Sequence, residues 1–71
     1  MEIPVDKVGR ILAGDEVGRY VRIIDDADST GGFLILTATY PDMVGAYDAW
    51  VEDKEGLIRY FVEAKWLVEW L

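Results

Sequence analysis

The sequence contains no histidine, cysteine, asparagine or glutamine, and its only serine is Ser29. Nucleophilic catalysis needs a Ser, Cys or Thr beside a base, most often His, and metal-assisted hydrolysis usually needs His or clustered carboxylates. Two carboxylates suffice for a glycosidase, but a chain of 71 residues can hardly form the sugar cleft between them. No Gly-rich phosphate loop is visible either. The inventory predicts a protein that is not an enzyme and needs no cofactor or metal.

Other absences indicate the cellular compartment in which the protein is expected. Without cysteine the chain has no disulfide and no thiolate metal site, which suits the cytoplasm. The N-terminus, MEIPVDKVGR, lacks a basic region followed by an apolar run, so no secretory signal is expected. No stretch approaches 18 uninterrupted apolar residues, so no membrane span is expected. We predict a cytoplasmic protein.

Apolar and aromatic residues are abundant. Hydrophobic residues make up 52% of the chain, with three Trp, four Tyr and two Phe. Because each aromatic side chain buries a large area, this content can support a core near the lower size limit for a stable fold. We predict a single domain over residues 1–71.

The net charge is −7, from 14 acidic and 7 basic residues. Such a charge repels nucleic-acid phosphates and anionic membranes, and it attracts a basic protein. We therefore expect a basic protein partner and no direct binding of nucleic acid. The alternative is that the charge serves solubility alone.

Two helices are predicted. The first follows Pro4, with apolar residues at helical spacing and Gly14 as its C-terminal cap, although Gly9 weakens it. The second begins after Asp53 as N-cap, with Leu57, Tyr60, Phe61 and Ala64 on one face.

Alternation of apolar and polar residues predicts strands over 19–25, 33–40 and 46–52. Residues 66–71 either form a last strand, which the alternation of Trp66, Val68 and Trp70 favours, or continue the second helix. The predicted fold class is α+β, in the order α-β-β-β-α-β, with an antiparallel sheet packed against two helices.

The stretch DDADSTGGF resembles the start of a calcium-binding EF-hand loop when it is read from Asp26. Position 12 of that loop is Thr37 instead of the required bidentate Glu, and the flanking segments are predicted strands. Asp, Ser and Thr satisfy turn backbone locally, and Gly31 and Gly32 allow positive φ. The stretch therefore predicts a hairpin turn.

Two acidic groups stand out, one in this turn and one around the third strand and the following helix. If both lie on one side, they form a single acidic surface; otherwise they are solvated acids and a helix cap. Tyr40, Tyr47 and Trp50 are candidate aromatic anchors for a partner, and each also suits the core. The candidate partner-binding residues are Asp25, Asp26, Asp28, Asp48, Trp50, Glu52, Asp53 and Glu55.

The segments TGGFLIL, AWVED and LIRYFVEAKWLVEWL together resemble small acidic bacterial immunity proteins of polymorphic and contact-dependent toxin systems. The resemblance covers most of the chain from Arg19 onward. It implies an α+β protein that binds and neutralises a basic toxin, often a nuclease, in the cytoplasm of the producing cell. Two alternatives remain: a phage-type acidic mimic of nucleic acid that inhibits a host defence or DNA-binding protein, and a homo-oligomeric assembly module, for instance a homodimer.

Overall fold

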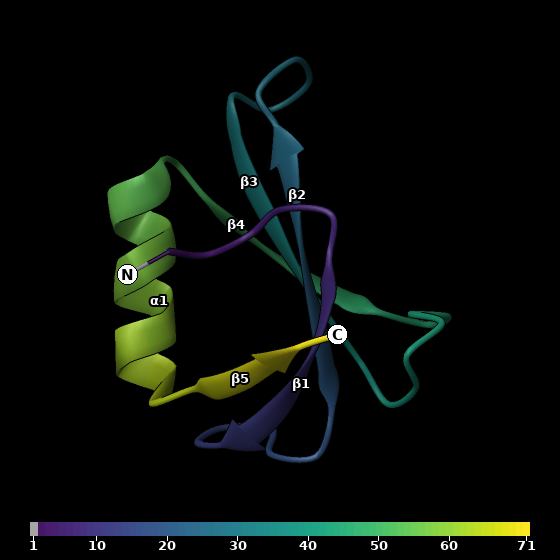
Figure 1. Cartoon of the computed structure of the whole chain (residues 1–71). Coiled ribbons are helices and arrows are strands. Elements are labelled where there is room, and N and C mark those ends of the chain that lie inside the picture. Colours follow the sequence, from purple (N-terminus) through teal and green to yellow (C-terminus); the bar gives the residue numbers. More distant parts are fainter. Residues whose placement is uncertain (1) are drawn as a thin grey trace.

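The computed structural model describes residues 2–71. They form one antiparallel sheet of five strands and one helix (Figure 1). In chain order the elements are β1 (Val8–Ala13), β2 (Tyr20–Asp26), β3 (Gly32–Ala38), β4 (Tyr47–Val51), α1 (Lys54–Ala64) and β5 (Leu67–Trp70).

The first four strands follow one another as neighbours in the sheet, and β5 returns to pair with β1. The spatial order is β4-β3-β2-β1-β5, so β4 and β5 are the edge strands. The helix α1 links these two edges. Figure 1 shows the sheet strongly twisted, with α1 on one of its faces.

The core lies between α1 and the sheet face that it covers. Ile11, Val21, Ile23 and Ile35 are fully buried there. They come from the three central strands, where alternate residues point to the same face. The helix contributes Leu57, Phe61 and Ala64, spaced so that they share one side of α1.

The prediction of a helix after Pro4 is wrong. Val8–Ala13 forms the strand β1, and residues 2–71 have the order β-β-β-β-α-β with a single helix. Burial along this segment has a period of two, since Gly9 and Ile11 are buried while Arg10 and Leu12 are exposed. A Cβ atom on Gly9 would collide with side chains of β5, including the ring of Trp70 at 2.8 Å. Close packing of β1 between two strands outweighs the helical spacing of its apolar residues.

The boundaries of α1 have local causes. Asp53 is the N-cap, as predicted, and its Oδ1 accepts the N–H of Gly56 at 2.8 Å. At the other end Lys65 adopts a left-handed conformation with φ of 58°, and the carbonyl of Phe61 accepts the N–H of Trp66 at 3.1 Å. This cap ends the helix, so the last segment is a strand and not its continuation. No helix in residues 2–71 has the length and apolar character needed to cross a membrane.

Candidate functional site

The acidic stretch after β2 is a hairpin turn. The carbonyl of Asp26 accepts the N–H groups of Ser29 at 3.1 Å, Thr30 at 2.9 Å and Gly31 at 3.1 Å. The Oδ1 atom of Asp25 accepts the N–H of Ala27 at 3.1 Å. These bonds close the turn between strands on both sides, so the predicted hairpin turn is confirmed.

We expect that this turn does not bind calcium at physiological concentrations. Among residues 2–71, no group of three or more acidic side chains is placed to hold a metal ion. Calorimetric titration with calcium should show no binding tighter than about 1 mM, the weak end of the range for such loops. A micromolar dissociation constant would contradict this prediction.

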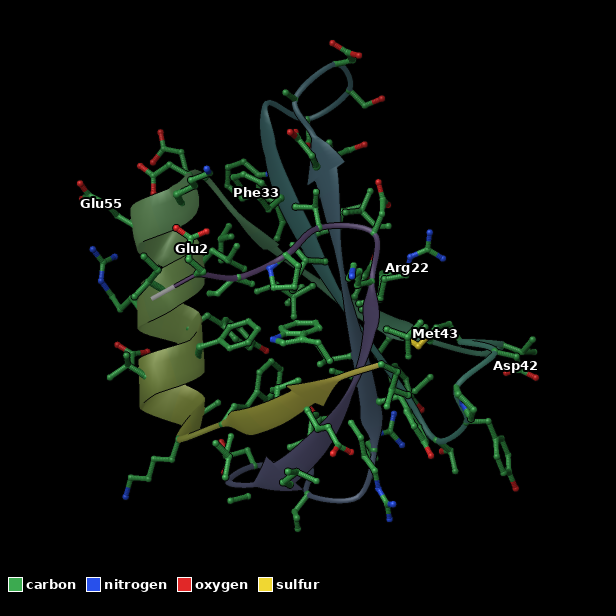
Figure 2. All side chains as sticks on the ribbon, viewed as in Figure 1. Glu2, Arg22, Phe33, Asp42, Met43 and Glu55 are labelled. Atoms are coloured by element: carbon green, nitrogen blue, oxygen red, sulfur yellow. The ribbon has the colours of Figure 1, made fainter. Side chains whose placement is uncertain are left out.

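The sheet register brings the two acidic groups to one end of the molecule. Phe33, just after the β2–β3 turn, pairs with Val51, the last residue of β4. The start of α1 therefore lies beside the turn, and Figure 2 shows Glu55 and Phe33 at this same end. We call this surface the acidic end. It comprises Asp25, Asp26, Asp28, Glu52, Asp53 and Glu55, all exposed except the half-buried Asp26.

Asp48 does not belong to the acidic end. It pairs with Leu36 in the middle of β3, four residues before Glu52, which corresponds to about 13 Å along a strand. Tyr40 and Tyr47 are also remote from the acidic end. Both are exposed, and the ring of Tyr47 lies 5.9 Å from the guanidinium of Arg19. Neither of these tyrosines is a core residue.

Trp50 is the candidate aromatic anchor that borders the acidic end. Its indole lies on Gly32, where a Cβ atom would be only 2.7 Å from the indole nitrogen. Its Nε1–H donates to the hydroxyl of Thr30 at 2.8 Å, in the same turn that carries Asp28. The side chain remains 49% exposed. The ring is therefore fixed in position and still accessible.

The start of α1 influences the charge and the free carboxylates of the acidic end. The free N–H groups of a helix N-terminus carry a partial positive charge, and Asp53 and Glu55 both lie in or next to the first turn of α1. The carboxylate of Asp53 is engaged in capping, so its capacity for a partner is reduced. Asp28, Glu52 and Glu55 accept no side-chain hydrogen bond within residues 2–71 and form no ion pair there.

A groove runs from the acidic end along β4 and α1. We call it the β4–α1 groove; its volume is about 420 Å³. Four of the predicted partner-binding residues line it, namely Trp50, Glu52, Asp53 and Glu55. Arg59, Tyr60 and Glu63 of α1 also line it. The sequence had indicated Tyr60 only as a residue on the packed face of a helix.

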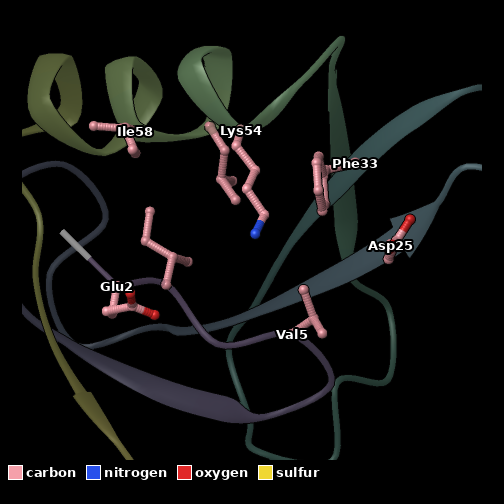
Figure 3. A pocket seen from close by; sticks show the side chains of 8 residues that line it. Glu2, Val5, Asp25, Phe33, Lys54 and Ile58 are labelled. Atoms are coloured by element: carbon pink, nitrogen blue, oxygen red, sulfur yellow. The ribbon is translucent and has the colours of Figure 1, made fainter.

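A second hollow, of about 300 Å³, has Asp25 of the acidic end in its wall (Figure 3). Its walls include the apolar Ile3, Val5 and Phe33, and Lys54 extends into it from α1. Lys54 is the one basic residue within the segments 25–31 and 51–56, and it forms no ion pair among the described residues. Nothing in the sequence indicated that Lys54 and Asp25 line the same hollow.

Comparison of the chain with models of protein families, with curated proteins and with solved structures gave no match. The resemblance to immunity proteins is therefore neither supported nor contradicted by these comparisons. The functional argument depends on the surface itself.

Proposed function

We propose that this protein is a non-enzymatic inhibitor that binds a basic protein through the acidic end. The observation that carries the proposal is the convergence of six carboxyl groups from two separate chain segments, with Lys54 as the one basic residue among them. A fold alone does not imply a function, so the proposal depends on this site.

The charge of the surface defines the partner. With a net charge of −7, the protein attracts a positively charged surface and repels nucleic acid. Opposite charges on two proteins accelerate their encounter and orient them, and they contribute more to the association rate and to specificity than to affinity. A nuclease toxin offers such a surface, because its substrate-binding cleft must attract phosphates.

Tight binding requires contacts beyond the attraction of opposite charges, and in this proposal Trp50 provides them. Tryptophan is enriched among the few residues that contribute most of the binding energy in protein interfaces. The ring of Trp50 is already held by Thr30 and Gly32, so little conformational entropy is lost when a partner covers it. Acidic side chains around a preorganised aromatic residue suit a tight protein interface.

The test is co-expression in bacteria with the product of the gene adjacent to the one that encodes this chain. We expect the adjacent product alone to stop growth, and co-expression to restore growth and yield a complex of the two proteins. A harmless adjacent product that does not bind would contradict the immunity role. Binding only to a host DNA-binding protein would favour the mimic of nucleic acid, and self-association alone, measured by light scattering, would favour the assembly module.

A further inference from the structure

A third hollow, of about 200 Å³, lies where the β1–β2 turn meets the last turns of α1. We call it the far pocket. It is lined by Asp15, Glu16, Tyr60, Glu63, Ala64 and Trp66. Tyr60 and Glu63 also line the β4–α1 groove, so the far pocket continues that groove away from the acidic end.

The far pocket has rigid walls. The N–H of Asp15 donates to the carbonyl of Ala64 at 2.9 Å, and the indole Nε1–H of Trp66 donates to the carbonyl of Asp15. These two bonds fix the turn against the end of α1. The rings of Tyr60 and Trp66 lie 5.5 Å apart at 60°, and Phe61 packs edge-on against Trp66 at 5.0 Å.

The charge of the far pocket is only partly compensated. Glu16 pairs with Arg19 at 3.2 Å. Asp15 and Glu63 form no ion pair within residues 2–71, although Arg59 lies one helical turn before Glu63. Burial raises the pKa of the Tyr60 phenol, and the negative charges of Glu16 and Asp15 raise it further. The charge of the far pocket therefore acts on its aromatic wall.

We propose that the far pocket binds the guanidinium group of an arginine side chain from the basic partner. This inference deepens the proposed function and rests on it for the origin of the arginine. The guanidinium is planar, so it can stack on the Tyr60 ring while its N–H groups donate to carboxylates. Asp15 and Glu63 supply two such acceptors on opposite elements, the β1–β2 turn and α1.

Size and chemistry restrict the ligand to a single cationic side chain. The far pocket is smaller than the roughly 300–1,000 Å³ of sites that hold drug-sized molecules. An anionic ligand would be repelled by its carboxylates. A neutral side chain would gain contact with Tyr60 but leave Asp15 and Glu63 without a charged partner.

The test uses a probe that does not require the partner. Acetyl-arginine amide is titrated into the labelled protein, and the indole N–H and tyrosine ring signals are followed by NMR. We expect saturable shifts of Trp66 and Tyr60, with Trp70 as the internal reference because it lies outside the far pocket. Acetyl-citrulline amide has nearly the same shape without the charge, and we expect it to cause no such shifts.

Two matched variants complete the design. Glu63→Gln removes a carboxylate from the far pocket, and Glu69→Gln makes the same charge change on β5, outside it. We expect Glu63→Gln to weaken probe binding about two- to five-fold, as for a partly exposed charge contact, and Glu69→Gln to leave it unchanged. Equal effects of the two variants, or equal shifts with citrulline, would overturn the site.

The two proposals can fail separately. If the probe binds at Tyr60 and Trp66 but no basic partner exists, the far pocket stands and the inhibitor function falls. If a basic partner binds but the arginine probe does not, the inhibitor function stands and the far-pocket proposal falls.

Discussion

Replacing Trp66 by alanine is expected to unfold the protein or to leave it barely stable. The side chain is only 9% exposed and packs against Phe61 and Tyr60. Truncating a buried Trp to Ala costs about 3–5 kcal/mol, whereas a chain of this size has a total stability of roughly 4–10 kcal/mol. The substitution also removes the donor to the Asp15 carbonyl, which holds the β1–β2 turn.

Urea denaturation followed by circular dichroism measures this loss. The control is Leu67→Ala, because Leu67 is the next residue but is 60% exposed, and such surface changes usually alter stability by less than about 0.5 kcal/mol. Truncation after Lys65 removes Trp66 together with β5, the partner of β1, and should leave an unfolded chain. A truncated chain with a cooperative transition would show that β5 is dispensable.

Charge reversal at the acidic end is expected to slow association with the partner about ten-fold. The variant carries Asp28→Lys and Glu52→Lys, two exposed acids from the two segments that converge. Each substitution changes the charge by two units, from −7 to −3 in total. Electrostatic steering raises association rates by about 10- to 1,000-fold, so losing part of it should be easy to measure in a stopped-flow experiment.

The matched control carries Asp48→Lys and Glu69→Lys, which change the net charge equally but lie outside the acidic end. We expect a much smaller effect on the association rate. The wild-type rate should also fall as salt rises, because interactions beyond a Debye length of about 8 Å are screened at physiological ionic strength. Equal slowing by the two variants would mean that overall charge matters and the acidic end does not.

Local patterns predicted much of the fold. Strands around Val21 and Ile23 and around Ile35, the helix with Asp53 as its cap, and the terminal strand all lie where alternation or helical spacing placed them. The prediction for the first segment was wrong because the helical spacing of its apolar residues is misleading: Leu12 is exposed, and the buried face of the strand consists of Gly9 and Ile11. Pairing of β1 with β2 and β5 decides its structure, and the contacts with β5 join residues far apart in the sequence.

For the candidate site, too, the sequence predicted which residues take part but not how the fold brings them together. Composition identified both acidic groups, but only the register of β3 against β4 shows that Asp28 and Glu52 share one end and that Asp48 does not. Tyr60 lies on the helix face predicted with Leu57, Phe61 and Ala64 and is partly buried against the core, and Trp66 is buried. The exposed edges of Tyr60 and Trp66 form a pocket only because the β1–β2 turn, with Asp15, folds against the end of α1.

The most direct test of the central claim is a map of the contact surface in the complex with the adjacent gene's product. Backbone amide signals of the labelled protein are recorded by NMR with and without that partner. The proposed function predicts that the largest changes fall in residues 25–31 and 51–56, with the Trp50 indole among them. Changes confined to β5 and the 40–46 loop would contradict it.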